Sequence, residues 1–227
     1  GLFLTAIGAD QYRYHPLFHA FLQQRARAAI PDWAELHARA AAYYRDIGAG
    51  ERVLYHLSSV DDSAGVAAEL VGLAQSWIDE GRSVTLIDWL DRLPPAALVD
   101  YPELLVARGD AERLLARFEA ALASYATAEQ QYAQLGDPIG QSRALKGQAQ
   151  IYLDTVRPAP ATALLRRAYK LLPPEQSGAR LALLRRIAEN RLNSGNPVQA
   201  LRLYRLAERM SGTSQIDPRV FLRLGLL

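Results

Sequence analysis

The chain has 227 residues, of which 50% are hydrophobic and 22% are charged, and its formal net charge is +2. This composition is typical of soluble globular proteins, and the length suffices for one large or two small domains. Cysteine is absent, which excludes disulfides, thiolate-bound zinc, iron–sulfur clusters and a cysteine nucleophile.

The longest apolar runs are far shorter than the roughly 18 residues that indicate a membrane span. The N-terminal residues also lack the basic region of a secretory signal. We therefore expect a cytoplasmic protein with no membrane partner. Because the chain begins without Met, we expect it to be a segment from the interior of a longer protein.

The two ends of the sequence differ in charge. Residues 1–140 carry 11 basic and 19 acidic side chains, whereas residues 141–227 carry 15 basic and 5 acidic ones. A basic C-terminal half can attract an anionic partner. Only Lys146 and Lys170 are lysines among the 26 basic residues, so the base composition of the genome explains the arginine excess equally well.

The first predicted element is a short β-hairpin, in which Leu2-Phe3-Leu4 and Tyr12-Arg13-Tyr14 flank a polar turn at Gly8-Ala9-Asp10-Gln11. From about residue 16 onward, abundant Ala, Leu, Arg and Glu between turn residues predict about ten amphipathic helices. Asp217-Pro218 is a favourable start for the last of these helices.

A pattern of Ala, then an aromatic residue or Leu, then Ala recurs three times at spacings of 40 and 39 residues. Its members are Ala121-Tyr125-Ala128, Ala161-Leu165-Ala168 and Ala200-Tyr204-Ala207. It resembles the tetratricopeptide (TPR) repeat, whose standard period is about 34 residues and whose small residues let paired helices approach closely. Glu112 and Arg191 stand where an aromatic residue is usual, so the repeats are degenerate. We predict an all-α fold, a right-handed α-solenoid of TPR-like helix pairs with a short N-terminal β-hairpin.

Motifs of enzyme chemistry are missing from the sequence. Neither Lys146 nor Lys170 lies in the Gly-Lys-Ser/Thr context of a phosphate-binding loop, and there is no Gly-x-Ser-x-Gly or His-Glu-x-x-His motif. We therefore predict no catalytic residues, no metal ligands and no cofactor in this segment. The protein is interpreted as a non-enzyme.

The histidines and tryptophans are interpreted as structural residues. His15 and His19 are four residues apart, but no neighbouring carboxylate completes a metal site. His37 and His56 are interpreted as single histidines on separate amphipathic helices. Trp33, Trp77 and Trp89 lie at helical contact spacing, which favours packing over ligand stacking.

The first helix of each pair lines the concave face of a TPR solenoid, and this register defines a candidate binding groove. Its predicted residues are Arg113, Arg143, Lys146, Gln150, Asp154, Arg185, Glu189 and Asn193, with Glu103 and Asp110 at one end. An Arg-rich lining suits a polar or anionic small molecule or an acidic peptide, because Arg offers a planar pair of donors. The alternative interpretation is that these are solvated charges that pair with one another.

One string of residues resembles a known family. The segment from Tyr12-Arg13-Tyr14-His15 to Phe21-Leu22 is similar to one in MalT-like, large ATP-binding LuxR-type transcription activators of the STAND class. The pattern Leu36-His37-x-x-Ala40-Ala41-x-Tyr43-Tyr44 is similar to the same family. The resemblance spans residues 1–100, and degenerate TPR-like repeats follow in the family as they do here.

The resemblance implies three parts. They are the end of a winged-helix element over residues 1–30, a helical arm over residues 31–100 and degenerate TPR-like repeats over residues 101–227. It implies a sensor that receives a small-molecule inducer or a regulatory protein or peptide and passes the signal to an intramolecular nucleotide-binding domain. ATP and DNA would bind only to domains outside this segment. A generic TPR adaptor without a link to transcription is the alternative, and direct nucleic-acid binding by the basic half ranks last because no recognition motif is present.

Overall fold

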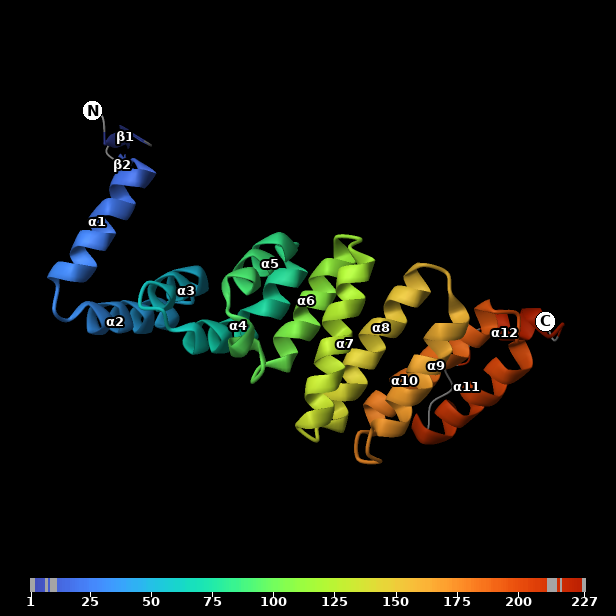
Figure 1. Cartoon of the computed structure of the whole chain (residues 1–227). Helices are drawn as coiled ribbons and strands as arrows, with labels where there is room; N and C mark the ends of the chain where they lie inside the picture. Colours follow the sequence, from blue (N-terminus) through green and yellow to red (C-terminus); the bar gives the residue numbers. More distant parts are fainter. Residues whose placement is uncertain (1–2, 7, 9–11, 212–215, 217, 226–227) are drawn as a thin grey trace. The chain divides into compact units, whose positions relative to one another are not determined.

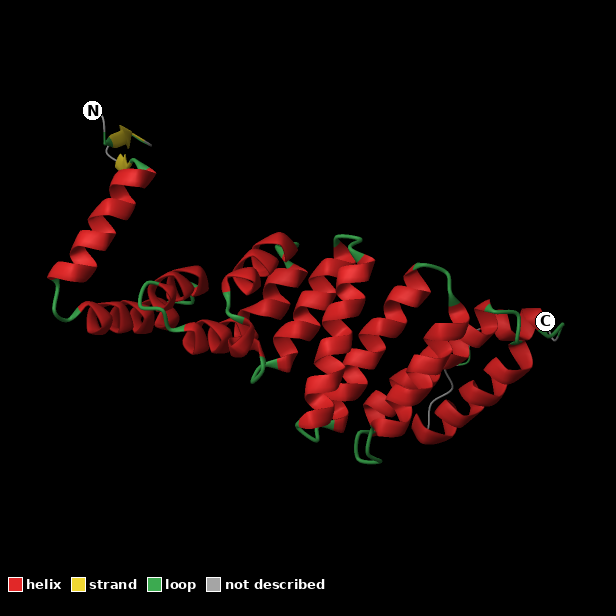
Figure 2. Cartoon of the chain, in the orientation of Figure 1, coloured by secondary structure: helices red, strands yellow, loops and turns green. Residues whose placement is uncertain are grey.

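The computed structural model describes residues 3–6, 8, 12–211, 216 and 218–225. They form two compact units, residues 1–69 and residues 70–227, and the boundary falls within helix α4 (Ser63–Asp79). Figures 1 and 2 show a two-stranded hairpin followed by a succession of helices. The predicted domain boundaries at residues 30 and 100 stay predictions.

The N-terminal unit begins with the predicted hairpin. Strands β1 (Leu4–Ala6) and β2 (Tyr12–Tyr14) pair antiparallel, with Leu4 opposite Tyr14. The hairpin is confirmed, but its first strand is Leu4–Ala6 and not the predicted Leu2–Leu4; Leu2 and the turn residues Ala9, Asp10 and Gln11 lie outside the described residues. Helix α1 (Pro16–Ala29) follows, and the Nδ1 atom of His15 accepts a hydrogen bond from the amide of Leu17 at 3.3 Å. His15 therefore caps this helix.

Helices α2 (Trp33–Asp46) and α3 (Gly50–Ser58) meet through two histidines. The Nδ1 atoms of His37 and His56 are 3.0 Å apart, so one ring donates a hydrogen bond to the other. The ring of Trp33 lies 4.3 Å from that of His37, and the ring of Tyr44 stacks on His56 at 5.4 Å. The two histidines pack against each other in one aromatic cluster and not singly, which agrees with their interpretation as structural residues.

The second unit contains the C-terminal part of α4 and a series of antiparallel helix pairs (Figure 1). Its further elements are α5 (Ser83–Arg92), η1 (Pro95–Leu98), α6 (Pro102–Leu114), α7 (Phe118–Gln134), α8 (Pro138–Asp154), α9 (Pro158–Leu171), α10 (Ser177–Asn193), α11 (Pro197–Ser211) and α12 (Pro218–Arg223). Helix α12 begins where the sequence predicts a helix, although Asp217 itself lies outside the described residues.

The three Ala triplets of the repeat pattern lie in the core. All six of their Ala side chains, from Ala121 to Ala207, are at most 3% exposed, and Tyr125 is completely buried. The first helices α8 and α10 each contribute to two successive core clusters. Helix α8 supplies Ala144 and Ile151 to one cluster and Leu145 and Ala149 to the next. Every helix pair is therefore stabilised by its neighbours, as in a solenoid.

Glu112, one of the departures from the repeat pattern, is accommodated by hydrogen bonds. Its side chain is buried and accepts bonds from Arg108 Nε at 3.1 Å and from Ser124 Oγ at 2.7 Å. A buried carboxylate is costly without such partners. The two donors therefore satisfy the carboxylate that stands where a standard repeat has an aromatic ring.

The turns within the helix pairs share one backbone geometry. Gly195 has a φ of 77°, and the corresponding residues of the two preceding repeats, Ala116 and Val156, have φ values of 57° and 56°. Glycine adopts this left-handed conformation without strain, whereas a β-branched side chain such as that of Val156 is strained there.

Candidate functional site

The first helices of three successive pairs present one continuous stripe of side chains, which we call the first-helix groove. Most of its residues recur every three or four positions, and they come from α6, α8 and α10. They are Glu103, Val106, Ala107, Asp110 and Arg113, then Ile139, Arg143, Lys146, Gln150, Leu153 and Asp154, then Ala179, Ala182, Arg186, Glu189 and Asn193. This spacing places the residues of each helix on one face.

Three cavities lie along the groove, with volumes of about 540, 580 and 310 Å³. The first lies between the end of α4, α6, α7 and α8, and the second between α8, α9 and α10. The first two share Ile139 and Arg143 in their linings, while the second and third share Gln150, Leu153 and Arg186. The cavities are therefore parts of one surface.

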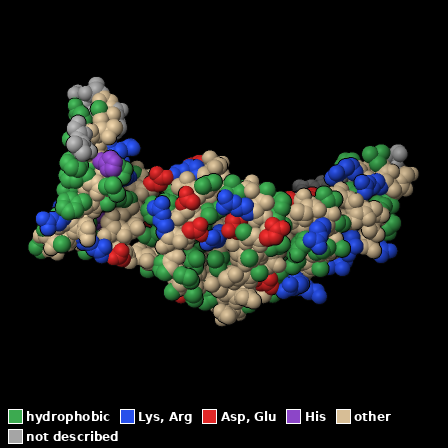
Figure 3. Space-filling view, turned by 45° about the horizontal axis from the view of Figure 1, so that its top comes forward, with side chains coloured by type: hydrophobic (Ala, Val, Ile, Leu, Met, Phe, Trp, Pro, Cys, Tyr) green, Lys and Arg blue, Asp and Glu red, His purple; other side chains and the backbone are tan. Residues whose placement is uncertain are grey.

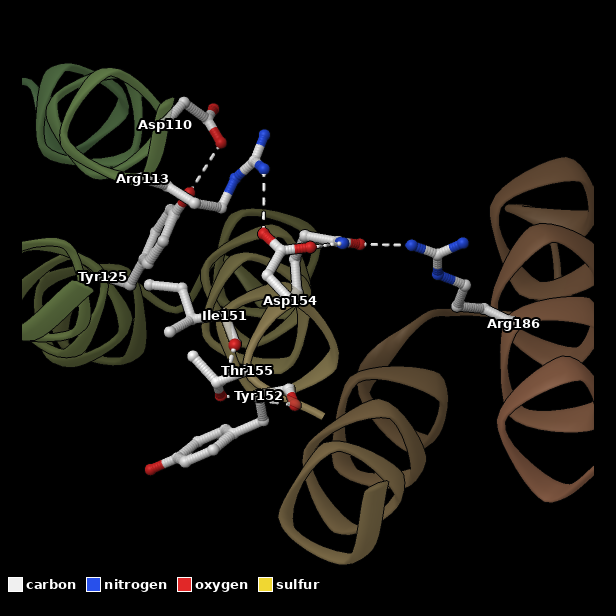
Figure 4. A network of polar contacts seen from close by, with 9 residues as sticks. Asp110, Arg113, Tyr125, Ile151, Tyr152, Asp154, Thr155 and Arg186 are labelled. Carbon is white, nitrogen blue, oxygen red and sulfur yellow. Dashed lines mark hydrogen bonds and ion pairs between the residues drawn. The ribbon is translucent and has the colours of Figure 1, made fainter. Parts of the chain in front are cut away.

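A polar network crosses the groove from α6 to α10 (Figure 4). Arg113 Nη1 donates to Asp154 Oδ2 at 3.0 Å, and Gln150 Nε2 donates to Asp154 Oδ1 at 2.6 Å. Arg186 Nη2 donates to Gln150 Oε1, and its Nη1 atom lies 3.4 Å from Glu189. The three first helices are thus joined by side chains as well as by the core.

Tyr125 lies beneath one end of this network. Its ring fills the space between Gly109 of α6 and Gly147 of α8, where a Cβ atom would lie 2.7 and 2.3 Å from the ring carbons. Its hydroxyl donates to Asp110 Oδ1 at 2.6 Å. Burial raises the pKa of Tyr125, and the negative charge of Asp110 raises it further, so the hydroxyl stays protonated.

Tyr132 lies about two helical turns after Tyr125 on α7. It lines the first cavity together with Arg143 and is itself 5% exposed. Burial raises the pKa of Tyr132 to about 12, although the positive charge of Arg143 acts in the opposite direction. Both hydroxyls are therefore protonated and neutral at physiological pH.

The structure brings together seven of the eight predicted groove residues. Gln150, Asp154, Glu189 and Asn193 line the third cavity, Arg143 and Lys146 line the second with Gln150, and Arg113 reaches the groove through its bond to Asp154. Glu103 and Asp110 line the first cavity, as the register predicts.

Arg185 is not placed among the cavity-lining residues. Its Nε atom is buried without a hydrogen-bond partner among the described residues, and Arg186 lines the groove instead. Successive helical residues point about 100° apart, so a one-residue difference removes a side chain from the face. The sequence register also missed Arg157, which lines the third cavity and lies 5.1 Å above the Tyr152 ring.

The described residues hold neither a metal-binding cluster nor a membrane-spanning helix. No group of three or more His, Asp or Glu side chains in that part of the chain is arranged to hold a metal ion. None of the described helices combines the length and the apolarity that a membrane crossing needs.

Comparisons with known proteins place the fold. No family model matches the chain. A solved structure titled "Crystal structure of MamA protein" superposes with a TM-score of 0.60 and 13% sequence identity, over 81% of this chain and 94% of that one. MamA is a TPR-like helical-repeat protein. This chain has a TPR-like fold. The predicted all-α solenoid of TPR-like pairs is confirmed, and a likeness at this low identity concerns the fold alone.

Proposed function

We propose that this TPR-like chain is a binding protein without catalytic activity, and that the first-helix groove takes up a segment of a partner protein or peptide. The observation that carries the proposal is the stripe of side chains from α6, α8 and α10 that lines three connected cavities. Helical-repeat proteins bind partners on such extended surfaces.

The chemistry of the groove supports a polar or acidic partner. Arg113–Asp154 and Arg186–Glu189 are ion pairs whose side chains are about one quarter to one half exposed. Pairs of this kind contribute little to stability, about 0–1 kcal/mol, so a partner can exchange them for its own charges. Arg143 and Lys146 are exposed and have no ion-pair partner among the described residues, which leaves two cations for an incoming acid.

A random 12-residue peptide library displayed on phage tests this proposal. Selected peptides are synthesised, and their binding is measured by fluorescence polarisation against the native chain, Lys146→Glu and Arg166→Glu. Arg166 is an exposed cation on α9 that lines none of the three cavities, so it is the matched control. We expect Lys146→Glu to weaken binding at least about tenfold and Arg166→Glu to leave it unchanged. Equal losses in both variants would contradict the proposal.

A narrower proposal follows from the resemblance to MalT-like activators. The groove would receive an inducer or regulatory protein and shift an ATP-linked equilibrium in a nucleotide-binding domain of the same protein. The Tyr12-Arg13-Tyr14-His15 string supports it, and so does the order of hairpin, arm helices and repeats. The gene provides the test, because a phosphate-binding loop should be encoded upstream of Gly1 and a LuxR-type helix-turn-helix downstream of Leu227. A gene without both would leave the generic binding role.

A further inference from the structure

The middle cavity differs from its two neighbours in charge. Its charged lining residues are Arg143 and Lys146 on α8 and Arg186 on α10, and no carboxylate lines it within the described part of the chain. The first cavity includes Glu103, Asp110 and Asp137, and the third includes Asp154 and Glu189. In Figure 3, Lys and Arg side chains gather over the C-terminal helices of the repeats.

The floor of the middle cavity is apolar. Leu165, Leu172 and Leu183 line it and are at most 4% exposed, and Ile139 and Leu153 complete the apolar part. Small side chains, Ala179 and Ala182, form the α10 wall and leave room above the leucines. A volume of about 580 Å³ falls within the range of about 300–1,000 Å³ that is usual for small-molecule sites.

The three cations are not equally engaged. Arg186 already meets Glu189 and Gln150, whereas Arg143 and Lys146 have no ion pair among the described residues and lie one helical turn apart on α8. Like charges at this spacing repel each other, and an anion between them removes the repulsion. Ser142, which is buried beside Arg143, and Gln176 add neutral polar groups to the lining.

We infer that the middle cavity binds a small amphipathic carboxylate, with its apolar body on the leucine floor and its carboxylate between Arg143 and Lys146. Each half of the site excludes another class of ligand. A bare anion leaves the more exposed apolar residues of the lining, Ile139 and Leu153, in contact with water, and a neutral or cationic amphiphile does not neutralise the paired cations. This inference rests on the proposed function, in which the first-helix groove is a binding surface.

Isothermal titration calorimetry with decanoate, kept below its micelle-forming concentration, tests the inference. We expect saturable binding with one decanoate per chain. Acetate, which has the charge without the apolar body, and decyl glucoside, which has the apolar body without the charge, should each bind at least about tenfold more weakly. Equal affinity for decanoate and decyl glucoside would overturn the assignment.

Variants locate the site. Arg143→Gln and Lys146→Gln each remove one exposed cation and should weaken decanoate binding about tenfold. Ala182→Asp places a carboxylate on an exposed part of the wall and should abolish saturable binding, while Arg166→Gln should leave the affinity unchanged. Circular dichroism of each variant establishes that it is folded.

The outcomes separate this inference from the proposed function. Full decanoate binding by Ala182→Asp, or none by the native chain while selected peptides still bind, would overturn the carboxylate site alone. Decanoate binding by the native chain, together with a phage library that yields no groove-dependent peptide, would overturn the peptide-binding role and keep the carboxylate site.

Discussion

Replacing Gly147 with Ala would test the close approach between α7 and α8. A Cβ atom at this position would lie 2.3 Å from the Tyr125 ring, whereas ordinary van der Waals contact begins at 3.4 Å. The ring would have to move by about 1 Å, and the backbone of Gly109 on its other side limits that movement, because it is so close that a Cβ atom added there would lie 2.7 Å from the ring.

The expected change in the free energy of unfolding follows from two opposing effects. Overpacking a rigid core costs about 1–3 kcal/mol, and a ring confined on both sides favours the upper end of that range. Ala is preferred over Gly inside a helix by about 1 kcal/mol. The net destabilisation is therefore about 2 kcal/mol, which lowers the melting temperature by roughly 4–8 °C in a chain of this length.

Thermal unfolding followed by circular dichroism measures this change, with two comparisons. Gly72→Ala makes the same substitution within α4 at a position with nothing within 4 Å, and it should raise stability slightly. Tyr125→Leu removes the ring, so adding Gly147→Ala in that background should cost much less than in the native chain. An undiminished cost in that background, or a stabilising Gly147→Ala in the native chain, would refute the reasoning.

Three other predictions concern packing, pH and backbone strain. Ala161→Phe at a completely buried contact should cost about 1–3 kcal/mol in urea unfolding, and Ala163→Phe on the exposed side of α9 should cost far less; similar costs would contradict the repeat register. Burial lowers the pKa of His37 and of His56, and the charges of His37 and Arg52 lower that of His56 further. The unfolded chain therefore binds more protons, so stability should fall as the pH drops below about 6.5, and His56→Phe should flatten this dependence in melting curves from pH 8 to pH 5. Val156→Gly relieves a β-branched residue at a φ of 56° and should raise the melting temperature, whereas Arg157→Gly in the same turn should not.

The repeat architecture was predictable because its signal lies in single helices. Ala161, Leu165 and Ala168 are spaced so that they share one face, and small residues at such spacing indicate close helix contacts before any tertiary information exists. The same periodicity located most of the groove. It failed at Arg185, because a register error of one residue turns a side chain out of the lining and substitutes Arg186.

Features that depend on contacts between helices were not predictable from one helix at a time. His37 and His56 are 19 residues apart on different helices, and their contact depends on how α2 packs on α3. The left-handed turns do carry a signal in the sequence. Ala116, Val156 and Gly195 follow one another at the same spacings of 40 and 39 residues as the Ala triplets, so the glycine of the third repeat marks the turn geometry of the other two.

The middle cavity shares residues with the core, and this limits how its function can be separated from stability. Leu165, Leu172 and Leu183 belong to the cluster that joins α8, α9 and α10, and they are also the cavity floor. Shortening any of them would lower stability and binding together, so neither loss could be assigned. Arg143 and Lys146 are exposed and make no ion pair within the described residues. Removing their charge therefore weakens the attraction for an anionic ligand at little cost to the stability of the fold. A ligand that contacts the floor should therefore raise the stability of the α8–α10 packing as its occupancy rises. If Lys146→Gln loses this ligand-dependent stabilisation, the change in unfolding stability reports the loss of binding.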